Sequence, residues 1–483
     1  MWQTLVIYGS QVFAALYIPI AILASIHVVL HKDDERAAIG WVGLIWLSPI
    51  IGGLLYWFFG INRIRRKAHV LKADQPAVRV APDQSVASEQ HIRAVLGDRG
   101  EHLRPLMHLV GRLTDRSLLA GNAVKPLIAG DAAYPAMIEA IDHARQSVAM
   151  SSYIFDNDRA GRMFRDALAR AVRRGVEVRV LIDDVGSRYT WPPIVRSLRR
   201  AGIPTARFLP SMIPWSASYA NLRNHRKLLI VDAAVGFTGG MNIRAGNLLD
   251  TAPRAPIHDL HFHLEGPVVA HLLEAFAEDW VFTTGEQLTG EPWSPGPEPR
   301  GQGLARGIAD GPDEDYDKLR LTLMGALSAA RRRVVIVTPY FLPDDALLTT
   351  MGVAAQRGVR VQVILPERSN LRLVQWAVTA TLPRTLAHGS EVWLSPAPFD
   401  HSKLMVVDDA WTLLGSANWD ARSLRLNFEF NVESYDPALV GRLNGLIDDK
   451  LAHARRLDAT ELARRRLLVR IRDGVARLAS PYL

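Results

Sequence analysis

The sequence of 483 residues contains no cysteine. Disulfide bonds and sites that bind a metal through thiolates are therefore excluded, although the cellular compartment stays open. Clusters of histidine, aspartate and glutamate with the spacing of a metal site are missing as well, so we expect neither a metal ion nor another cofactor. The N-terminus also lacks the basic start and the small-residue cleavage site of a secretory signal peptide, so we expect its apolar segment to be retained.

Acidic residues are fewer than basic ones, 49 against 57, which gives a net charge of +8 and an isoelectric point near 9.7. An excess of positive charge suits an anionic partner, either nucleic acid or anionic lipid. Two apolar runs, Leu5–Val29 and Ile39–Ile61, decide between these partners, because each run is long enough to cross a bilayer. A hydrophobic hairpin packed inside a soluble domain is the alternative, but two such runs in tandem are hard to bury. We therefore expect a two-helix transmembrane hairpin, and lipid rather than nucleic acid as the partner.

The charges that flank these runs predict an orientation in the membrane. Basic residues follow the second run at Arg63, Arg65, Arg66 and Lys67, whereas the turn between the runs mixes both signs of charge. Because positively charged flanks stay on the cytoplasmic side, we expect both the N-terminus and the region after Lys67 to be cytoplasmic.

One short pattern occurs twice, far apart in the chain. Each copy has a histidine, a lysine two residues later, an aspartate five residues after the lysine and an asparagine ten residues after the aspartate. The copies are His225, Lys227, Asp232 and Asn242, and His401, Lys403, Asp408 and Asn418. A single histidine and lysine at this spacing is common on protein surfaces, but two copies with the same internal distances indicate one active site built from two halves.

The residue types point to phosphodiester chemistry. In an extended chain, residues i and i+2 share a face, so the histidine and the lysine of each copy are expected to point the same way. If both copies surround one phosphate, one imidazole can attack phosphorus while the other protonates the leaving oxygen. The lysines, the asparagines and the small-residue turn at Ser416 then hold the charged phosphoryl oxygens. The role of the two aspartates is left open: they are either members of the site or caps of the turns that end each strand.

Together these residues resemble the HKD motif of the phospholipase D superfamily. The similarity to bacterial cardiolipin synthases covers nearly the whole chain and includes the segments 224–229, 239–243, 338–343, 422–424, 427–429 and 479–481. The resemblance implies that carboxylates after the motifs, Asp259 and Glu429, orient the histidines. It also implies that His225 is the nucleophile and that His401 is the general acid and base. His258 stands where an arginine is more common in the family, which leaves the head-group preference open.

The resemblance further implies a phosphatidyltransferase of the bacterial inner (cytoplasmic) membrane that needs no cofactor. Such an enzyme joins two phosphatidylglycerol molecules through a phosphatidyl-histidine intermediate and releases cardiolipin and glycerol, so these lipids are its expected partners in the bilayer. Phosphatidylethanolamine is the alternative second substrate. A hydrolytic phospholipase D acting on anionic phospholipids is the alternative function, because it uses the same chemistry with water as the acceptor.

The order of apolar segments predicts an α/β fold. Strands are expected at 147–155, 176–182 and 228–231, with a helix at 162–174, and the second half of the chain repeats this order. We expect two phospholipase D-like mixed β-sheet domains, flanked by helices in a pseudo-two-fold arrangement and preceded by the transmembrane hairpin. The expected boundaries are 1–67 for the hairpin anchor, 68–104 for a connector, 105–283 for the first domain, 284–313 for a linker and 314–483 for the second domain.

Arginines are interleaved with leucines and valines in the C-terminal tail from Lys450 onward. This pattern fits two interpretations, a solvated helix packed on the second domain or an amphipathic helix that lies on anionic lipid.

Overall fold

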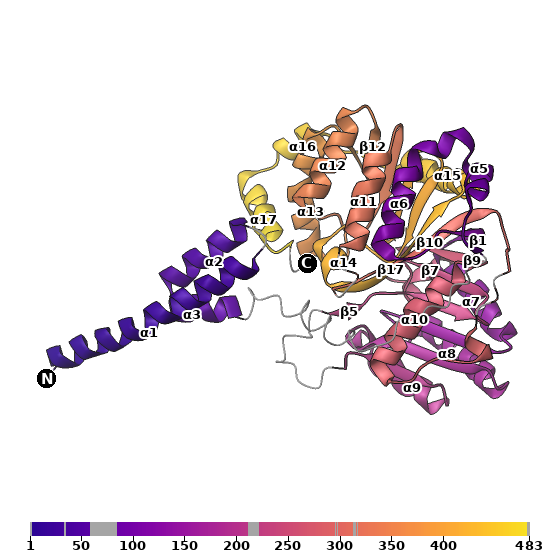
Figure 1. The fold of residues 1–483 in the computed structure, drawn as a ribbon, viewed down its shortest axis with the longest axis horizontal. Helices are drawn as coiled ribbons and strands as arrows, with labels where there is room; N and C mark the ends of the chain where they lie inside the picture. The colour runs from indigo at the N-terminus through magenta and orange to yellow at the C-terminus, as the bar shows by residue number, and fades with distance from the viewer. Residues whose placement is uncertain are drawn as a thin grey trace. The chain divides into compact units, whose positions relative to one another are not determined.

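The computed structural model describes residues 2–32, 35–57, 85–210, 222–294, 296, 298–312, 315 and 317–480. The chain divides into an N-terminal unit and a larger unit that contains both histidine motifs, and Figure 1 labels the elements of both. The basic residues at 63–67 and most of the predicted connector lie outside the described residues.

In the part that the structure describes, the N-terminal unit contains the helices α1 (Trp2–His31), α2 (Glu35–Leu47) and α3 (Pro49–Leu55). The second apolar run of the sequence is thus divided near its middle, and the third helix begins at Pro49. Proline is favoured in this first position because its missing amide hydrogen costs a helix nothing there.

A small core holds the three helices together and is made of Ala21, Val28, Ile45 and Tyr56. Many other large apolar side chains of this unit face outward, among them Leu23 and Leu47. In the described part of the chain, no helix combines the length and the apolar character that crossing a membrane requires.

The larger unit is built on one mixed β-sheet. Its first half contributes β1 (Leu119–Ile128), β2 (Ser147–Ser152), β3 (Glu177–Asp183), β4 (Thr205–Phe208), β6 (Leu228–Val231), β7 (Val235–Gly239) and β9 (Leu260–Glu265). Its second half contributes β10 (Gly303–Asp310), β11 (Arg333–Val337), β12 (Arg360–Pro366), β13 (Glu391–Ser395), β15 (Leu404–Val407), β16 (Trp411–Gly415), β17 (Asn427–Tyr435) and β18 (Arg455–Arg456). The strands expected from the apolar runs at 228–231 and 404–407 are confirmed.

The strand order is the same in both halves. From the centre outward it runs β1-β9-β7-β6-β2-β3-β4 in the first half and β10-β17-β16-β15-β11-β12-β13 in the second. The antiparallel pair of β1 and β10 joins the two halves into a continuous sheet. The internal duplication inferred from the sequence is therefore confirmed in the order of the strands.

Helices flank this sheet, and equivalent helices begin in equivalent ways. In the first half, α8 (Arg159–Arg173) is capped by Asp158, whose side chain accepts a hydrogen bond from the amide of Gly161. In the second half, α12 (Asp345–Gln356) is capped by Asp344 in the same manner. Such caps satisfy amide groups that a helix start leaves without a partner.

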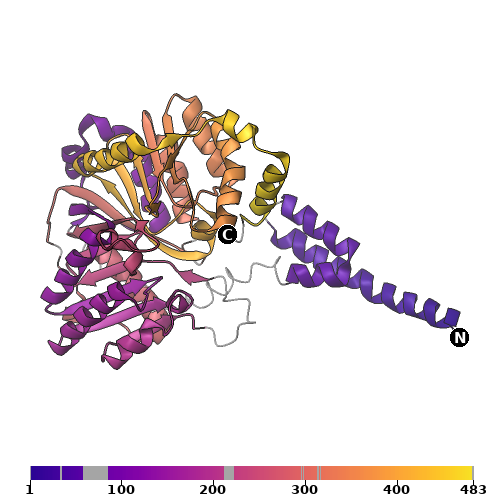
Figure 2. The same ribbon diagram turned by 180° about the vertical axis from the view of Figure 1, so that it is seen from behind.

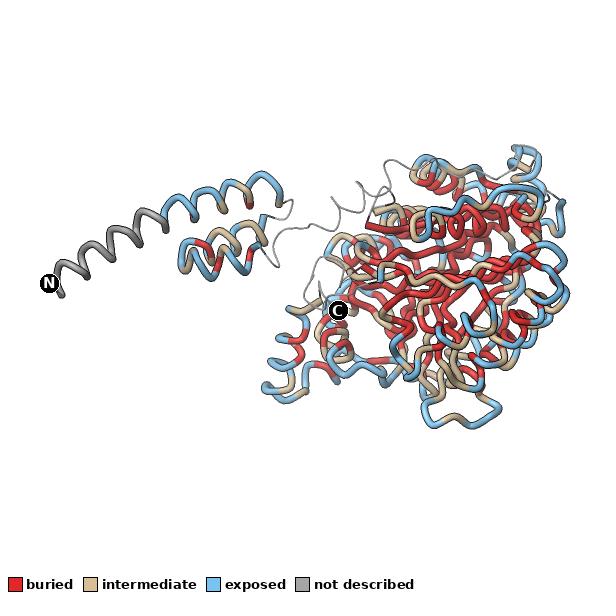
Figure 3. The backbone as a smooth tube through the Cα atoms, turned by 90° about the horizontal axis from the view of Figure 1, so that it is seen from below, coloured by how far each residue is buried: buried red, intermediate tan, exposed pale blue. Residues whose placement is uncertain are grey.

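The remaining helices of the larger unit are α5 (Glu89–Leu96), η3 (Gly97–Leu103), α6 (Arg104–Thr114), α7 (Ala129–His143), α9 (Ile194–Arg200), α10 (Val269–Thr284), α11 (Lys318–Ala329), α13 (Arg372–Ala387), α14 (Ala421–Arg425), α15 (Pro437–His453), α16 (Ala459–Ala463) and α17 (Leu467–Leu478), with short 3₁₀ turns between some of them. Figures 1 and 2 view the protein from opposite sides and show α11 on one side of the sheet and α15 on the other. Figure 3 shows that the buried residues are concentrated in the strands between such layers.

One predicted boundary is wrong. The segment 284–313 was expected to be a linker, but β10 lies within it and is buried along its whole length at the centre of the sheet. The glycines, prolines and acidic residues on either side dominate the composition of the segment. They mask the short apolar pattern formed by Leu304, Ala305, Ile308 and Ala309.

Two short parallel pairs connect the halves beside the main sheet. In the first pair β5 (Arg223–Asn224) lies against Asn427 and Phe428 of β17. In the second pair β14 (Phe399–Asp400) lies against β8 (Ile257–His258). Each pair ends immediately before one of the two motif histidines, so these pairs determine where the histidines lie.

Candidate active site

The two histidines enter one cleft from opposite halves of the sheet. The backbone amide of His225 donates to the carbonyl of Phe428 (2.9 Å), and that of His401 donates to the carbonyl of His258 (2.7 Å). Both rings line the same cleft, which has a volume of about 350 Å³. The sequence-based prediction that the two motifs build one site is in agreement with this placement.

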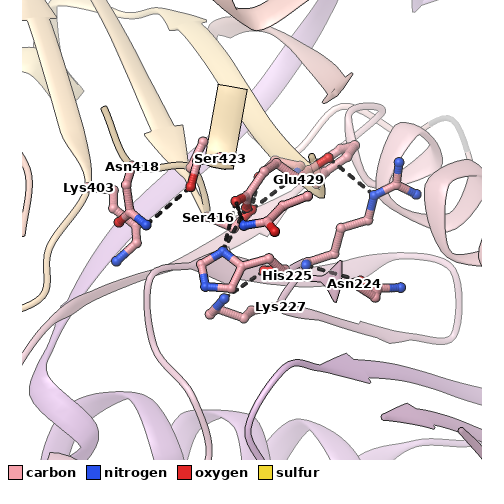
Figure 4. Close-up of polar contacts among 12 residues, drawn as sticks. Asn224, His225, Lys227, Lys403, Ser416, Asn418, Ser423 and Glu429 are labelled. Carbon is pink, nitrogen blue, oxygen red and sulfur yellow. Dashed lines mark hydrogen bonds and ion pairs between the residues drawn. The ribbon is translucent and has the colours of Figure 1, made fainter. Parts of the chain in front are cut away.

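The carboxylate that orients the first histidine belongs to the second half. His225 Nδ1 lies 2.9 Å from both carboxylate oxygens of Glu429. Glu429 also accepts hydrogen bonds from Ser416 Oγ (2.5 Å) and Asn427 Nδ2 (3.2 Å), as Figure 4 shows for part of this network. The carboxylate is fully buried, so these donors hold it in one orientation.

The second histidine is oriented by the first half in return. His401 Nδ1 lies 2.7 Å from Oδ2 of Asp259, while the other oxygen of Asp259 accepts from the amide of Leu260 (2.8 Å). Each motif histidine is therefore paired with the carboxylate that follows the other motif. The exchange results from the short strand pairs, because Asp259 directly follows β8 and Glu429 directly follows Phe428.

The exchange determines which ring nitrogen is available for chemistry. With Nδ1 bonded to a carboxylate, a neutral imidazole carries its proton there and presents the lone pair of Nε2 to the cleft. Burial lowers the pKa of His225 to about 4, helped by the nearby ammonium of Lys227 and opposed by Glu429. Burial and Lys403 lower the pKa of His401 as well. The lowered pKa values favour neutral imidazoles at neutral pH.

The lysine of each motif contacts the backbone of the histidine in the same motif. The ammonium of Lys227 donates to the carbonyl of His225, and that of Lys403 to the carbonyl of His401, both over 2.6 Å. Lys403 Nζ also approaches both nitrogens of the His401 ring, at 3.0 and 3.1 Å. The residues 225–227 and 401–403 are not part of β6 and β15 but immediately precede these strands.

Burial lowers the pKa of both lysines because it removes water from their charges. The pKa of Lys227 falls to about 7, and the repulsion from Lys403 contributes to that fall. The pKa of Lys403 falls to about 8. Two buried cations at one place interact with a bound phosphate more strongly than surface lysines do, because little water is left to screen their charges.

The phosphate-binding residues expected from the sequence divide into two groups. Asn242 and Asn418 line the cleft. Asn242 accepts the amide of Ile154 with Oδ1 (3.1 Å), and Asn418 Nδ2 donates to Ser423 Oγ (3.2 Å). The hydroxyl of Ser416 instead donates to Glu429, so the structure assigns Ser416 to the support of that carboxylate and corrects its expected contact with phosphate.

The structure does not bring the motif aspartates to the histidines. The carboxylate of Asp232 accepts the backbone amides of Arg145, Gln146 and Ser147, at 2.7–3.1 Å. Asp232 follows the last residue of β6, and a strand advances about 3.3 Å per residue, so its carboxylate lies beyond the reach of a phosphate at His225.

Asp408 has the same place in the second half. Its carboxylate accepts the backbone amides of residues 331–333 at 2.7–2.9 Å and, in addition, a hydrogen bond from His102 Nε2 (2.8 Å). Of the two interpretations left open by the sequence, membership of the site or the capping of a turn, the contacts of Asp232 and Asp408 match the capping of a turn.

Two tyrosines were not predicted and lean against the histidines. The ring of Tyr153 meets His225 edge to face with centroids 4.9 Å apart, and Tyr340 meets His401 in the same way at 6.2 Å. Each tyrosine directly follows an equivalent stretch, Ser151-Ser152 in one half and Thr338-Pro339 in the other. An alignment of the sequences of the two halves would have identified both tyrosines, because they occupy equivalent positions.

Three arginines were also missed. Arg223, Arg244 and Arg422 line the cleft together with the histidines. Arg244 is paired with the buried carboxylate of Asp156 (3.2 Å). The three arginines outnumber the two carboxylates in the lining, Asp259 and Asp420, so the cleft suits an anionic substrate. In the described ranges, no group of three or more histidine, aspartate or glutamate side chains is arranged to hold a metal ion.

Comparison of the sequence with protein families and with known proteins identifies cardiolipin synthases as its relatives. The family described as "Cardiolipin synthase, PLD-like domain" matches residues 137–280 and 323–450, and "Phospholipase_D-nuclease N-terminal" matches residues 20–60. The chain is 30% identical to a cardiolipin synthase of Geobacillus kaustophilus over 98% of this chain and 94% of the relative. It is 32% identical to cardiolipin synthase A of Pseudomonas fluorescens over 95% of this chain and 96% of the relative.

Among solved structures, the phosphatidylserine synthase of Haemophilus influenzae Rd KW20 has a similar fold. It superimposes with a TM-score of 0.62 at 16% identity, over 78% of this chain and all of that one.

Proposed function

Because the chain belongs to the cardiolipin synthase family and is an enzyme of the phospholipase D superfamily, we propose that it transfers a phosphatidyl group between two phosphatidylglycerol molecules. The products are cardiolipin and glycerol. The observation that carries this proposal is the pair of imidazoles, each held by a carboxylate of the opposite half, that face one cationic cleft.

In the first step His225 Nε2 attacks the phosphorus of one phosphatidylglycerol. The bond from phosphorus to the oxygen of the head-group glycerol breaks, and His401 gives that oxygen a proton. For this step His401 must be protonated, and the negative charge of the bound phosphodiester favours its protonation. The result is a phosphatidyl group on His225 and free glycerol.

In the second step a glycerol hydroxyl of another phosphatidylglycerol attacks the same phosphorus. His401 removes the proton of this hydroxyl, and the bond between phosphorus and His225 breaks. One phosphodiester has then replaced another, so the exchange is close to neutral in energy and the original protonation states return.

The assignment of roles is supported by the surroundings of the two rings. His225 is the more deeply buried side chain, and its pKa of about 4 keeps it neutral and nucleophilic. His401 has Lys403 against its ring and is slightly more exposed, which suits a group that exchanges protons. The lysines, with Asn242 and Asn418, stabilise the charge on the phosphoryl oxygens in both steps.

Water competes with the lipid alcohol in the second step. Transfer then depends on positioning of the acceptor and on exclusion of water from the cleft. The apolar residues Ile257, Leu342 and Phe399 in the lining favour that exclusion.

A test uses the full-length protein in vesicles that contain phosphatidylglycerol as the only anionic lipid. We expect cardiolipin and glycerol in equal amounts, and no product from the His225→Ala variant. Phosphatidic acid without cardiolipin is the result that overturns transfer in favour of hydrolysis. Phosphatidylethanolamine added in a second series reports whether it is an acceptor.

We infer in addition that the N-terminal unit attaches the enzyme to the bacterial inner membrane, with the catalytic halves in the cytoplasm. Three observations support this inference: the two apolar runs, the outward-facing apolar side chains of the three helices, and the match of residues 20–60 to an N-terminal family. Fusions made after Lys67 test the orientation. Fluorescence from a reporter that folds only in the cytoplasm is expected, and activity of a reporter that works only in the periplasm contradicts it.

A further inference from the structure

The last helix of the chain carries an apolar face that no part of its own half covers. Five large side chains of α17 are each between 52% and 80% exposed. They are Leu467, Leu468, Ile471, Val475 and Leu478. With 3.6 residues per turn these positions fall on one side of the helix, so the exposed side chains form a continuous strip.

The opposite side of α17 is fixed to the catalytic half. Asp473 and Ala476 are buried, and Arg465 and Arg472 pair with the carboxylate of Asp473 at 2.5 and 2.7 Å. The guanidinium of Arg472 also lies 4.4 Å from the ring centre of Trp376 in α13. The helix therefore has a defined orientation, and Figures 1 and 2 both show it against α13.

Positive charge borders the apolar strip. Arg470 and Arg477 are exposed on the same helix, and Arg466, which directly precedes it, is exposed as well. The single acidic residue of α17 is Asp473, which is buried and paired. An apolar strip bordered by arginines matches a layer of anionic head groups over acyl chains. A second copy of the chain fits less well, because a symmetric contact would bring these arginines against one another.

The apolar cluster on which α17 packs shares residues with the lining of the cleft. Ala476 shares a buried cluster with Leu342 and Val374, and both of these residues also line the cleft. Leu371 and Leu373, at the start of α13, are about half exposed, and Leu371 is part of the cleft lining. The helix that supports the mouth of the cleft is thus the helix that carries α17.

From this geometry we propose that α17 is a membrane-docking helix, which lies in the surface of an anionic phospholipid bilayer on its strip of five apolar residues. Docking holds the mouth of the cleft at the lipid surface, so that the lipid head groups reach the histidines without leaving the leaflet. The delivery of head groups to the histidines rests on the proposed function, whereas the contact of α17 with lipid does not depend on the reaction that the cleft performs.

The absence of cysteine allows a direct test on the full-length protein. A single cysteine is introduced by Leu468→Cys and labelled with a fluorophore that responds to polarity. The matched control is Val353→Cys on α12, a side chain that is 53% exposed in the same unit. Both proteins are placed in phosphatidylcholine vesicles with and without phosphatidylglycerol, and quenching is measured with iodide in water and with spin-labelled lipid in the bilayer.

We expect the label at position 468 to be quenched by the spin-labelled lipid roughly threefold or more above the control when phosphatidylglycerol is present, since an interfacial helix buries its apolar face among the acyl chains. Protection from iodide should rise with the phosphatidylglycerol fraction. Val475→Cys, at a second position of the strip, should behave in the same way and guards against a local effect of one substitution.

Two outcomes overturn the proposal. Equal iodide quenching at positions 468 and 353 in phosphatidylglycerol vesicles means that the strip stays in water. Protection from iodide without quenching by the spin-labelled lipid means that protein covers the strip instead. A dependence of that protection on protein concentration then identifies a second copy as the cover.

Discussion

The two halves of the catalytic unit have the same strands in the same order, but they surround their histidines differently. His225 lies against Glu429, which is fully buried and receives two further side-chain donors. His401 lies against Asp259, which is equally buried and whose second oxygen accepts a backbone amide, and the ammonium of Lys403 lies 3.0 Å from Nδ1 of the His401 ring. A repeated fold thus places two chemically equal groups in unequal environments, which is what separate roles require.

The residues that precede the histidines continue this difference. In the first half, Asn224 bonds to the buried Asp279 (2.8 Å). In the second half, the equivalent Asp400 bonds to Lys450 (2.6 Å) and lies near His258 (3.4 Å). Burial raises the pKa of Asp400, but the charges of Lys450 and His258 outweigh it and hold the pKa far below the usual range. The residue before the histidine is therefore a neutral amide in the first half and an ion-paired carboxylate in the second.

The largest effect is expected from removing the histidines, and it should differ in kind between the halves. His225→Ala removes the nucleophile, so neither cardiolipin nor a covalent intermediate should form. His401→Ala removes the acid, which lowers the rate by about 10²–10⁴ but leaves bond formation to phosphorus possible. Acid quenching after reaction with labelled phosphatidylglycerol, followed by peptide mapping, measures the intermediate. Label found on residue 401 instead of residue 225 reverses the assignment.

A substrate with a good leaving group sharpens this difference. Nitrophenolate leaves phosphatidyl-nitrophenol without first taking up a proton, so the His401→Ala variant should recover most of the burst of released nitrophenolate, whereas the His225→Ala variant should recover none. Equal recovery in both variants would mean that the two histidines share their roles.

The carboxylates should follow the histidines that they contact, although these lie in the other half. Glu429→Gln and Asp259→Asn keep the size of the side chain but lose the charge that fixes the imidazole tautomer, and a fall in kcat of about 10²–10⁴ is expected. Because Glu429 contacts His225, Glu429→Gln should resist rescue by phosphatidyl-nitrophenol. Asp259→Asn should be rescued, as His401→Ala is. The opposite pattern contradicts the exchange of carboxylates between the halves.

The pH dependence tests the lysines that both halves supply. An ammonium is present below its pKa and is lost as the pH rises through it, and burial lowers the pKa to about 7 for Lys227 and about 8 for Lys403 in the free enzyme. We therefore expect kcat/KM to decline above roughly pH 7 and more steeply above roughly pH 8, by about tenfold per pH unit for each charge lost. Initial rates from pH 5 to pH 10 at constant vesicle composition measure this. A flat profile up to pH 10 means that both lysines keep their charge in the free enzyme.

Much of this site can be predicted from the sequence, because the duplicated spacing identifies the histidines, the lysines and the asparagines. The resemblance adds Asp259 and Glu429, but the partner of each carboxylate depends on the short pairs β5–β17 and β8–β14, which bridge the halves. Two-residue strands have no periodicity to detect. Ser416 was misassigned for a related reason: its hydroxyl contacts Glu429, which is thirteen residues away in sequence and adjacent only in the sheet.

The smallest effect on catalysis is expected at the aspartates that share the motif but not the site. Asp232→Asn and Asp408→Asn each replace a carboxylate that accepts hydrogen bonds from three backbone amides. The free energy of unfolding should therefore fall by roughly 1–3 kcal/mol in each variant. Asp408→Asn should cost more, because only Asp408 also bonds His102. Thermal unfolding of the detergent-solubilised protein measures the stability, and kcat/KM at a temperature below both transitions should change by less than about threefold. The contradicting outcome is that Asp232→Asn reduces activity as far as His225→Ala does and leaves the melting temperature unchanged. The aspartate would then have to act on the substrate, which contradicts its position outside the cleft at the end of β6.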